Sequence, residues 1–272
     1  MQANATSAVP PGLAGHRRGF RIHPLFAAAT LAVVVAATGV AGAAAWRHQA
    51  DARQSDIAQW QHLAATAADA GALQRLQQAA TAGETAGQAA LGETLLAHAD
   101  AATRAEGERW LRAAAGKGHH RAQFVLGKAA MLGTLAAGRT DLPLAWQWLD
   151  AAAKSGDLGA AYYLGLLYRG GYGRQPDPAR AARWFQAAAE GGVAQAMFLL
   201  ANAYRDGDGV ARDTARAVSW YEAAGEREHP AALQALAMAY RNGELDLPPD
   251  EDQYRQHMAE AAHALKHPAL NP

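Results

Sequence analysis

The sequence predicts an all-α protein, an α-solenoid of stacked helix hairpins preceded by one transmembrane helix. Two observations predict the solenoid, because two short motifs alternate along the chain at a nearly constant spacing. A third observation predicts the transmembrane helix, since residues 24–46 contain no charged side chain. The composition is that of a folded chain, with 50% hydrophobic and 18% charged residues among 272.

The N-terminal region begins with a segment that is expected to be a disordered cytoplasmic tail, residues 1–23, in which small and polar residues predominate. The uncharged segment 24–46 follows. At about 1.5 Å rise per residue it is long enough to cross a hydrocarbon core of about 30 Å. We therefore expect residues 24–46 to form a transmembrane signal anchor.

The charges around this segment predict its orientation. Arg17, Arg18 and Arg21 precede it without any acidic residue. The positive-inside rule then keeps the N-terminus in the cytoplasm and places the rest of the chain in the periplasm, as a single-pass protein of the inner membrane. The alternative is a cleaved leader, because Ala41-Gly42-Ala43 fits a small-residue cleavage pattern, and the chain would then be secreted into the periplasm.

One repeated motif is a tryptophan followed by small residues. Trp110, Trp148, Trp184 and Trp220 fall 38, 36 and 36 residues apart, and each precedes an alanine-rich run. Within the third copy, alanines and Trp184 recur at three- and four-residue steps, which predicts a helix with one apolar face.

The second motif is a leucine followed by glycine or alanine, and it alternates with the first. It occurs as Leu91-Gly92, Leu126-Gly127, Leu164-Gly165, Leu200-Ala201 and Leu236-Ala237. Tyrosines stand four residues after the last three leucines, at Tyr168, Tyr204 and Tyr240. Because each unit contains both motifs, each unit is predicted to be a helix hairpin, and single hairpins bury too little surface unless they stack.

Turn residues mark the ends of the predicted helices. Asp177 can cap the helix that follows it, and Pro178 suits the first position of that helix. Gly191 and Gly192 are expected to end this helix as left-handed caps. The small Gly165 should let the two helices approach, while Trp184 and Tyr168 fill the remaining space.

The arrangement resembles the Sel1-like repeat family, which is related to the tetratricopeptide repeats. Residues 194–225 carry the resemblance best, with Leu200, Tyr204, the Gly207-Asp-Gly-Val turn, Asp213 and Trp220 in place. The residues expected to pack the repeats are listed in chain order: Leu126, Gly127, Trp148, Leu164, Gly165, Tyr168, Trp184, Leu200, Tyr204, Trp220, Leu236 and Tyr240. The alanine-rich composition is typical of a bacterium with a GC-rich genome.

The motif positions predict the domain organisation. A linker or degenerate helical hairpin covers 47–84, and the repeat domain covers 85–265. Its units are about 86–118, 122–156, 160–192, 194–228 and 230–264, and a short tail, 266–272, follows. The last unit has His257 where tryptophan would stand, as expected of a terminal unit.

Several classes of function are disfavoured. The 25 basic and 25 acidic residues balance, so we expect no nucleic-acid partner. The absence of cysteine excludes thiolate metal sites and cysteine nucleophiles. Asp206-Gly-Asp208 resembles the start of a calcium loop but lacks the later ligands. We expect no catalytic, cofactor or metal site, no small-molecule substrate, and no enzyme activity.

Arg169, Arg205 and Arg241 each follow a motif tyrosine and are 36 residues apart, so stacking should align them as a basic ladder. Such a ladder could clamp carboxylates or phosphates of a partner. The alternative is that each arginine only satisfies the C-terminus of its own helix.

The function expected from the residues and the resemblance is a membrane-anchored adaptor or scaffold that mediates protein–protein interactions in the bacterial cell envelope. The alternative is an exported soluble periplasmic enzyme or ligand-binding protein with a cleaved leader. Neither the partner nor the pathway can be read from these residues.

Overall fold

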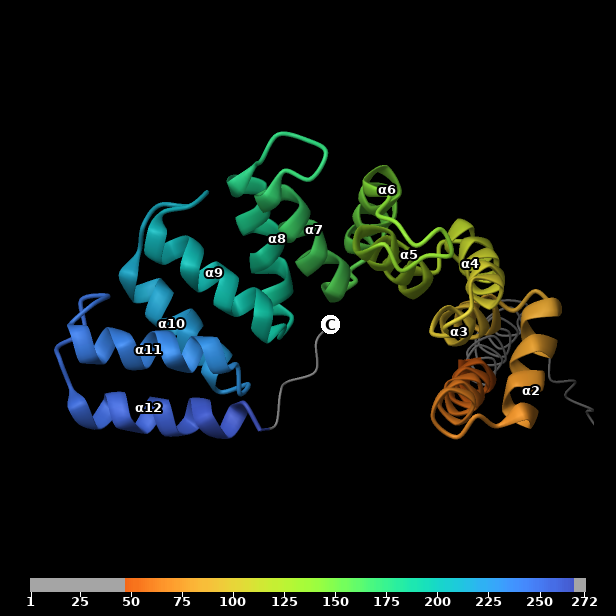
Figure 1. The fold of residues 1–272 in the computed structure, drawn as a ribbon, viewed down its shortest axis with the longest axis horizontal. Helices are drawn as coiled ribbons and strands as arrows, with labels where there is room; N and C mark the ends of the chain where they lie inside the picture. Colours follow the sequence, from red (N-terminus) through yellow and green to blue (C-terminus); the bar gives the residue numbers. More distant parts are fainter. Residues whose placement is uncertain (1–46, 267–272) are drawn as a thin grey trace, which may run out of the picture. The chain divides into compact units, whose positions relative to one another are not determined.

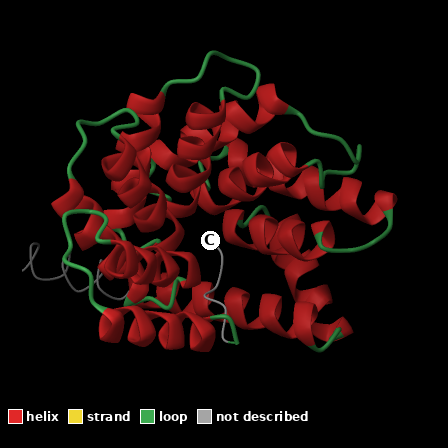
Figure 2. Cartoon of the chain, turned by 60° about the vertical axis from the view of Figure 1, so that its left-hand side comes forward, coloured by secondary structure: helices red, strands yellow, loops and turns green. Residues whose placement is uncertain are grey.

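The computed structural model describes residues 47–266, and all regular structure in that range is helical (Figure 2). The chain divides into two compact units, Met1–Arg53 and Gln54–Pro272. In the first unit the described residues, 47–53, are helical. The second unit contains the repeats, and it is described by itself below.

The helices of the second unit alternate between two roles, the first and the second helix of a hairpin. Residues 54–66 are helical, and α2 (Ala70–Thr81) follows. The first helices are α3 (Thr85–Leu96), α5 (His120–Leu132), α7 (Leu158–Gly170), α9 (Ala194–Asp206) and α11 (Pro230–Asn242). The second helices are α4 (Ala101–Gly116), α6 (Leu142–Lys154), α8 (Pro178–Glu190), α10 (Thr214–Gly225) and α12 (Glu251–Ala264).

Contacts between helices follow the order of the chain. Each first helix packs most extensively against the second helix of its own hairpin, and each second helix then packs against the first helix of the next hairpin. Figure 1 shows this order as a continuous change of colour from α2 to α12. Neighbouring first helices also touch, α3 with α5 and α5 with α7. The prediction of an all-helical solenoid is confirmed for these residues.

An aspartate begins every second helix. The side chains of Asp100, Asp141, Asp177, Asp213 and Asp250 each accept a hydrogen bond from a backbone N–H in the first turn. Such caps satisfy donors that a helix start leaves without a partner. The predicted cap at Asp177, with Pro178 next to it, is confirmed.

Glycines of positive φ stand at the ends of the hairpins. The first helices α5, α7, α9 and α11 each end at a left-handed glycine. In the turn after α8, the expectation of two left-handed glycines is half right. Gly192 has φ +96°, but Gly191 has φ −80° and remains right-handed, because the helix continues through it to the turn.

The core is a column of leucines and alanines. It extends from α3 to α11 as one cluster that contains the motif leucines of α5, α7, α9 and α11. A smaller cluster, which includes Ile57, Leu76 and Leu91, joins residues 54–66 to α2 and α3. Stacking therefore buries apolar faces that a single hairpin would expose.

Among residues 47–266, no helix combines the length and the hydropathy needed to span a membrane. The predicted anchor, 24–46, lies outside the described residues, as do the predicted tail 1–23 and residues 267–272.

Candidate functional site

The predicted packing residues of the first helices lie at the centre of the core. The leucines are at most 1% exposed in all four units: Leu126, Leu164, Leu200 and Leu236. The glycine after two of them faces the second helix of the same hairpin. A Cβ atom at Gly127 would lie 2.7 Å from Cγ of Leu149, and one at Gly165 would lie 2.5 Å from Cε1 of Phe185. A side chain at either glycine would therefore push the two helices apart.

The residue after each motif tryptophan fills the space in front of the first helix. The side chain nearest Gly165 belongs to Phe185, which follows Trp184 in sequence. Consecutive helical residues point about 100° apart, so only one of the two can face the first helix. The sequence analysis missed this set, which is at most 2% exposed and keeps the same spacing as the tryptophans: Leu111, Leu149, Phe185 and Tyr221.

The motif tryptophans instead lie at the edge of the core. Trp148, Trp184 and Trp220 are half-buried and pack against it. The indole nitrogen of Trp148 is buried without a hydrogen-bond partner. Two residues earlier, Trp146 is buried, and its Nε1 donates to the Tyr172 carbonyl oxygen at 2.8 Å.

The motif tyrosines tie each hairpin turn to its first helix. Their carbonyl oxygens accept the backbone N–H of the capping aspartates, at 2.8 Å for Tyr168, 2.9 Å for Tyr204 and 2.9 Å for Tyr240. The ring of Tyr168 lies edge-on to Trp146, with the centroids 4.8 Å apart. The ring of Tyr240 stacks on His257 at 5.7 Å.

The three arginines of the predicted ladder are exposed, but each contacts an aromatic ring of the helix that follows it. Arg169 lies over Phe185 at 5.7 Å, and Arg241 lies over Tyr254 at 5.0 Å. Nη1 of Arg205 donates to the Tyr221 hydroxyl at 3.2 Å. Each of the three side chains therefore contacts an aromatic group of the second helix in its own hairpin.

Arg205 differs from Arg169 because its guanidinium pairs with a carboxylate. Its Nε and Nη2 atoms donate to the two carboxylate oxygens of Asp206 at 2.7 and 2.8 Å. This contact holds the pKa of the Asp206 carboxyl below its ordinary value. No carboxylate of the described residues pairs with Arg169. The guanidinium of Arg169 is thus the one of the two that can still bind an anion bidentately.

The structure brings Arg169 and Arg205 to one groove, of about 210 Å³, between α8 and α9. Phe185, Asn202 and Asp208 also line it. Arg241 does not line this groove. In residues 47–266 no group of three or more histidines, aspartates or glutamates has an arrangement suited to a metal ion.

A second cluster, of the partly buried Lys128 and Tyr163 with the buried Phe124, lies on α5 and α7. Nζ of Lys128 is 5.6 Å from the ring centre of Phe124 and 5.0 Å from that of Tyr163. Partial burial, and secondarily the charge of Arg121, lower the pKa of the Lys128 ammonium. Arg121 itself is paired with Glu93 on α3 at 2.6 Å. First helices of different hairpins therefore contribute to one surface.

The solved structures that resemble the chain include the following two. The first is a Sel1 repeat protein from Oxalobacter formigenes, with 28% identity, 70% of this chain and 75% of that chain covered, and a TM-score of 0.60. The second is c5321, a protective antigen of uropathogenic Escherichia coli with an SLR fold. Its identity is 30%, 71% of this chain and 41% of that chain are covered, and the TM-score is 0.65. The present chain thus spans less than half of that antigen.

No curated protein matches the sequence at a significant level. The Sel1 repeat model matches residues 120–157, 159–193, 194–229 and 230–264, which together exceed half of the chain. The matches contain the hairpins α5–α6, α7–α8, α9–α10 and α11–α12, whereas α3 and α4 precede them. Repeats of this type build scaffolds that typically mediate protein–protein interactions. The chain belongs to the Sel1 repeat family.

Proposed function

We propose that this protein is a membrane-anchored scaffold that holds protein partners in the bacterial cell envelope. The observation that carries the proposal is the run of Sel1 hairpins over residues 120–264, because stacked hairpins present surface residues at regular intervals on a stable core. The uncharged segment 24–46 supports the anchor. The arginines before it support a cytoplasmic N-terminus and periplasmic repeats.

The surface residues that we propose for partner contact are Arg169, Arg205 and Arg241. Arg169 should contribute most, since Arg205 is already neutralised by Asp206. The partly exposed Lys128 and Tyr163 offer a cation and an aromatic ring on α5 and α7. A partner with acidic side chains would suit the arginines.

The membrane topology can be tested by cysteine labelling, because the chain has no cysteine of its own. An Ala187→Cys variant places one thiol on an exposed position of α8, and an Ala5→Cys variant places one near the N-terminus. In intact cells with a permeabilised outer membrane, an impermeant maleimide should label only Ala187→Cys. Labelling of Ala5→Cys alone would contradict the orientation, and a mature N-terminus after Ala43 would replace the anchor with a cleaved leader.

The scaffold role can be tested by cross-linking in cells, extraction of the full-length protein and affinity purification. We expect a reproducible partner with the wild-type chain and less of it with an Arg169→Glu, Arg205→Glu, Arg241→Glu triple variant. The circular dichroism of that variant should remain helical, because all three side chains are exposed. Recovery of no reproducible partner would contradict the scaffold role, while unchanged recovery with the variant would exclude the arginines.

A further inference from the structure

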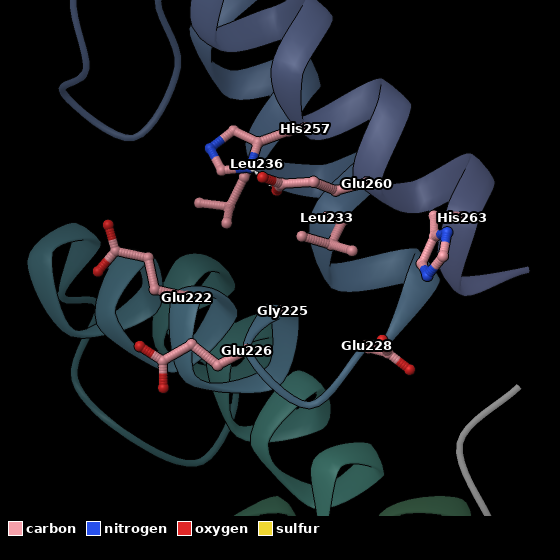
Figure 3. A pocket seen from close by; sticks show the side chains of 9 residues that line it. All are labelled: Glu222, Gly225, Glu226, Glu228, Leu233, Leu236, His257, Glu260 and His263. Atoms are coloured by element: carbon pink, nitrogen blue, oxygen red, sulfur yellow. Dashed lines mark hydrogen bonds and ion pairs between the residues drawn. The ribbon is translucent and has the colours of Figure 1, made fainter. Parts of the chain in front are cut away.

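A groove of about 500 Å³ lies between α10 and α12, with α11 beneath it. Figure 3 shows that Glu222 and Glu226 come from the α10 side, and His257 and Glu260 from the α12 side. Leu233 and Leu236 of α11 lie at its base. The base is already well packed, since Leu233 is 5% exposed and lies 2.8 Å from where a Cβ atom of Gly225 would be. The groove is therefore formed before any ligand arrives.

The rim of this groove is strongly acidic. Four glutamates line it, Glu222, Glu226, Glu228 and Glu260, in a chain whose total charges balance. Glu260 contacts His257 at 3.1 Å. Within residues 47–266 the other three glutamates form no ion pair. Arg227, the cation next to them in sequence, extends towards Gly192 instead. His263 lines the groove as well, so four carboxylates face two histidines around an apolar base.

Two of these carboxylates stand where the helix itself disfavours them. Glu222 lies in the last turn of α10, and Glu226 is its C-cap. The helix dipole makes the C-terminal end negative, so a carboxylate there is slightly destabilising. At the equivalent place in the preceding hairpin, Glu190 ends α8 and its carboxylate is hydrogen-bonded by Gln186 at 2.8 Å.

Glu228 occupies a position that glycine fills in every earlier turn of the same kind. Gly83, Gly118, Gly156 and Gly192 have φ between +85° and +96° there. Glu228 has φ +55° and makes the same backbone contact, its N–H donating to the Gly225 carbonyl oxygen at 2.8 Å. A side chain in this left-handed conformation is strained. The fold therefore would be better served by glycine, and the glutamate adds only its carboxylate at the groove.

We propose that this groove binds a basic segment of the protein partner, one that carries several lysines or arginines. The proposal rests on the scaffold function proposed above and specifies the chemistry of one contact. The aliphatic stems of the basic side chains lie over Leu233 and Leu236, and their cationic heads pair with Glu222, Glu226 and Glu228. The groove is separate from the arginines between α8 and α9, so a partner that reaches both must carry both charges.

The test uses the detergent-extracted full chain and a fluorescent peptide of alternating lysine and leucine, read by anisotropy. A peptide with glutamate in place of lysine is the control of opposite charge. We expect the lysine peptide to bind and the glutamate peptide not to bind. Replacing three rim charges in a Glu222→Gln, Glu226→Gln, Glu228→Gln variant should weaken the lysine peptide about tenfold. Glu190→Gln, at the equivalent position one hairpin earlier, should leave its affinity unchanged.

A Glu228→Gly variant separates binding from folding, because it should raise the midpoint of urea denaturation while it weakens the lysine peptide. Equal binding of both peptides, or an affinity unchanged by the three rim substitutions, would overturn the proposal. Cross-linking of the cellular partner then distinguishes the two proposals. If the triple Glu→Gln variant still captures the partner in wild-type amount, the scaffold role stands and the groove proposal falls. If the wild-type chain captures none, the scaffold role falls and the peptide affinities alone decide the groove.

Discussion

The inner hairpin α7–α8 and the last hairpin α11–α12 follow the same repeat but use their second helices differently. In α8, Phe185 and four alanines are buried, and Phe185 meets the bare backbone of Gly165. In α12 only Ala261 and Ala264 are buried, while Met258 is 36% exposed. α8 has a packed helix on each side, whereas α12 packs chiefly against α11. The side chains at the repeat positions are therefore buried in α8, which has a helix on each side, and more exposed in α12, which packs chiefly against α11.

The two hairpins also differ in the charged side chains that they carry. A turn between inner hairpins has Gly192, but the turn before the last hairpin has Glu228. The second helix of the last hairpin also carries His257 and Glu260 towards the groove. Among the described residues α12 packs chiefly against α11, so fewer of its side chains are fixed by packing.

The largest expected difference between the two hairpins concerns their second helices. Phe185→Ala should lower the free energy of unfolding by about 3–5 kcal/mol, since it removes a fully buried ring and leaves a cavity. Met258→Ala, the matched change in α12, should lower it by less than about 1 kcal/mol, because that side chain is partly in water already. Urea denaturation followed by circular dichroism measures both. Equal losses would show that the last hairpin is packed like an inner one.

A second comparison concerns the close approach of helices. Gly165→Ala should destabilise the protein by about 1–3 kcal/mol, because the new Cβ would lie 2.5 Å from the Phe185 ring. The equivalent residue of the last hairpin is already alanine, Ala237, and Ala237→Gly should destabilise it by about 1 kcal/mol through helix propensity alone. The same denaturation experiment applies. A neutral Gly165→Ala would mean that α7 and α8 can separate without loss.

Substitutions in the turns of the two hairpins should change the free energy of unfolding in opposite directions. Gly192→Ala should lower the free energy of unfolding by about 1 kcal/mol, because φ +96° is strained for any side chain. Glu228→Gly should raise it by about 1 kcal/mol for the same reason. Thermal denaturation of the two variants beside the wild type is sufficient. Destabilisation by Glu228→Gly would show that Glu228 makes a folding contact of its own.

The smallest expected effect is a pH dependence that the last hairpin has and the hairpin α7–α8 lacks. His229 caps α11, its Nδ1 accepting the Ala232 N–H at 3.3 Å, whereas Asp157 caps α7 at 2.8 Å. Burial lowers the pKa of His229 below 6.5, so the folded protein prefers the neutral ring. The unfolded chain then binds more protons as the pH falls below 6.5, and stability declines over that range.

A His229→Asp variant should remove part of this decline, which amounts to at most about 1 kcal/mol for one cap. The measurement is the urea midpoint at several pH values between 7 and 5. Asp177→Asn serves as the control, because Asp177 caps α8 and pairs with Arg180 and not with a histidine. A decline of the same size in His229→Asp would assign the pH dependence to other groups, His119 first, since it caps α5 and burial lowers its pKa as well.

Much of this architecture could be predicted because its determinants are local. The aspartate caps, the leucine column at Leu126, Leu164, Leu200 and Leu236, and the paired helices all follow from repeat spacing and turn chemistry, which a single unit already specifies. The equivalent positions of Arg169, Arg205 and Arg241 in their repeats could be predicted from their spacing of 36 residues. Their aromatic partners could not, because contacts between helices depend on how adjacent helices are rotated.

By itself, the sequence determined that this chain is a stack of helix hairpins, since a motif that recurs every 36 residues must place equivalent side chains at equivalent positions. Only the tertiary structure decided that Phe185, and not Trp184, closes on Gly165, because neighbouring positions on one helix face directions about 100° apart. It also decided that glutamates from α10, its following turn and α12 meet at one groove. Glu260 lies 32 residues after Glu228, and the packing of α12 on α11 brings it to the groove.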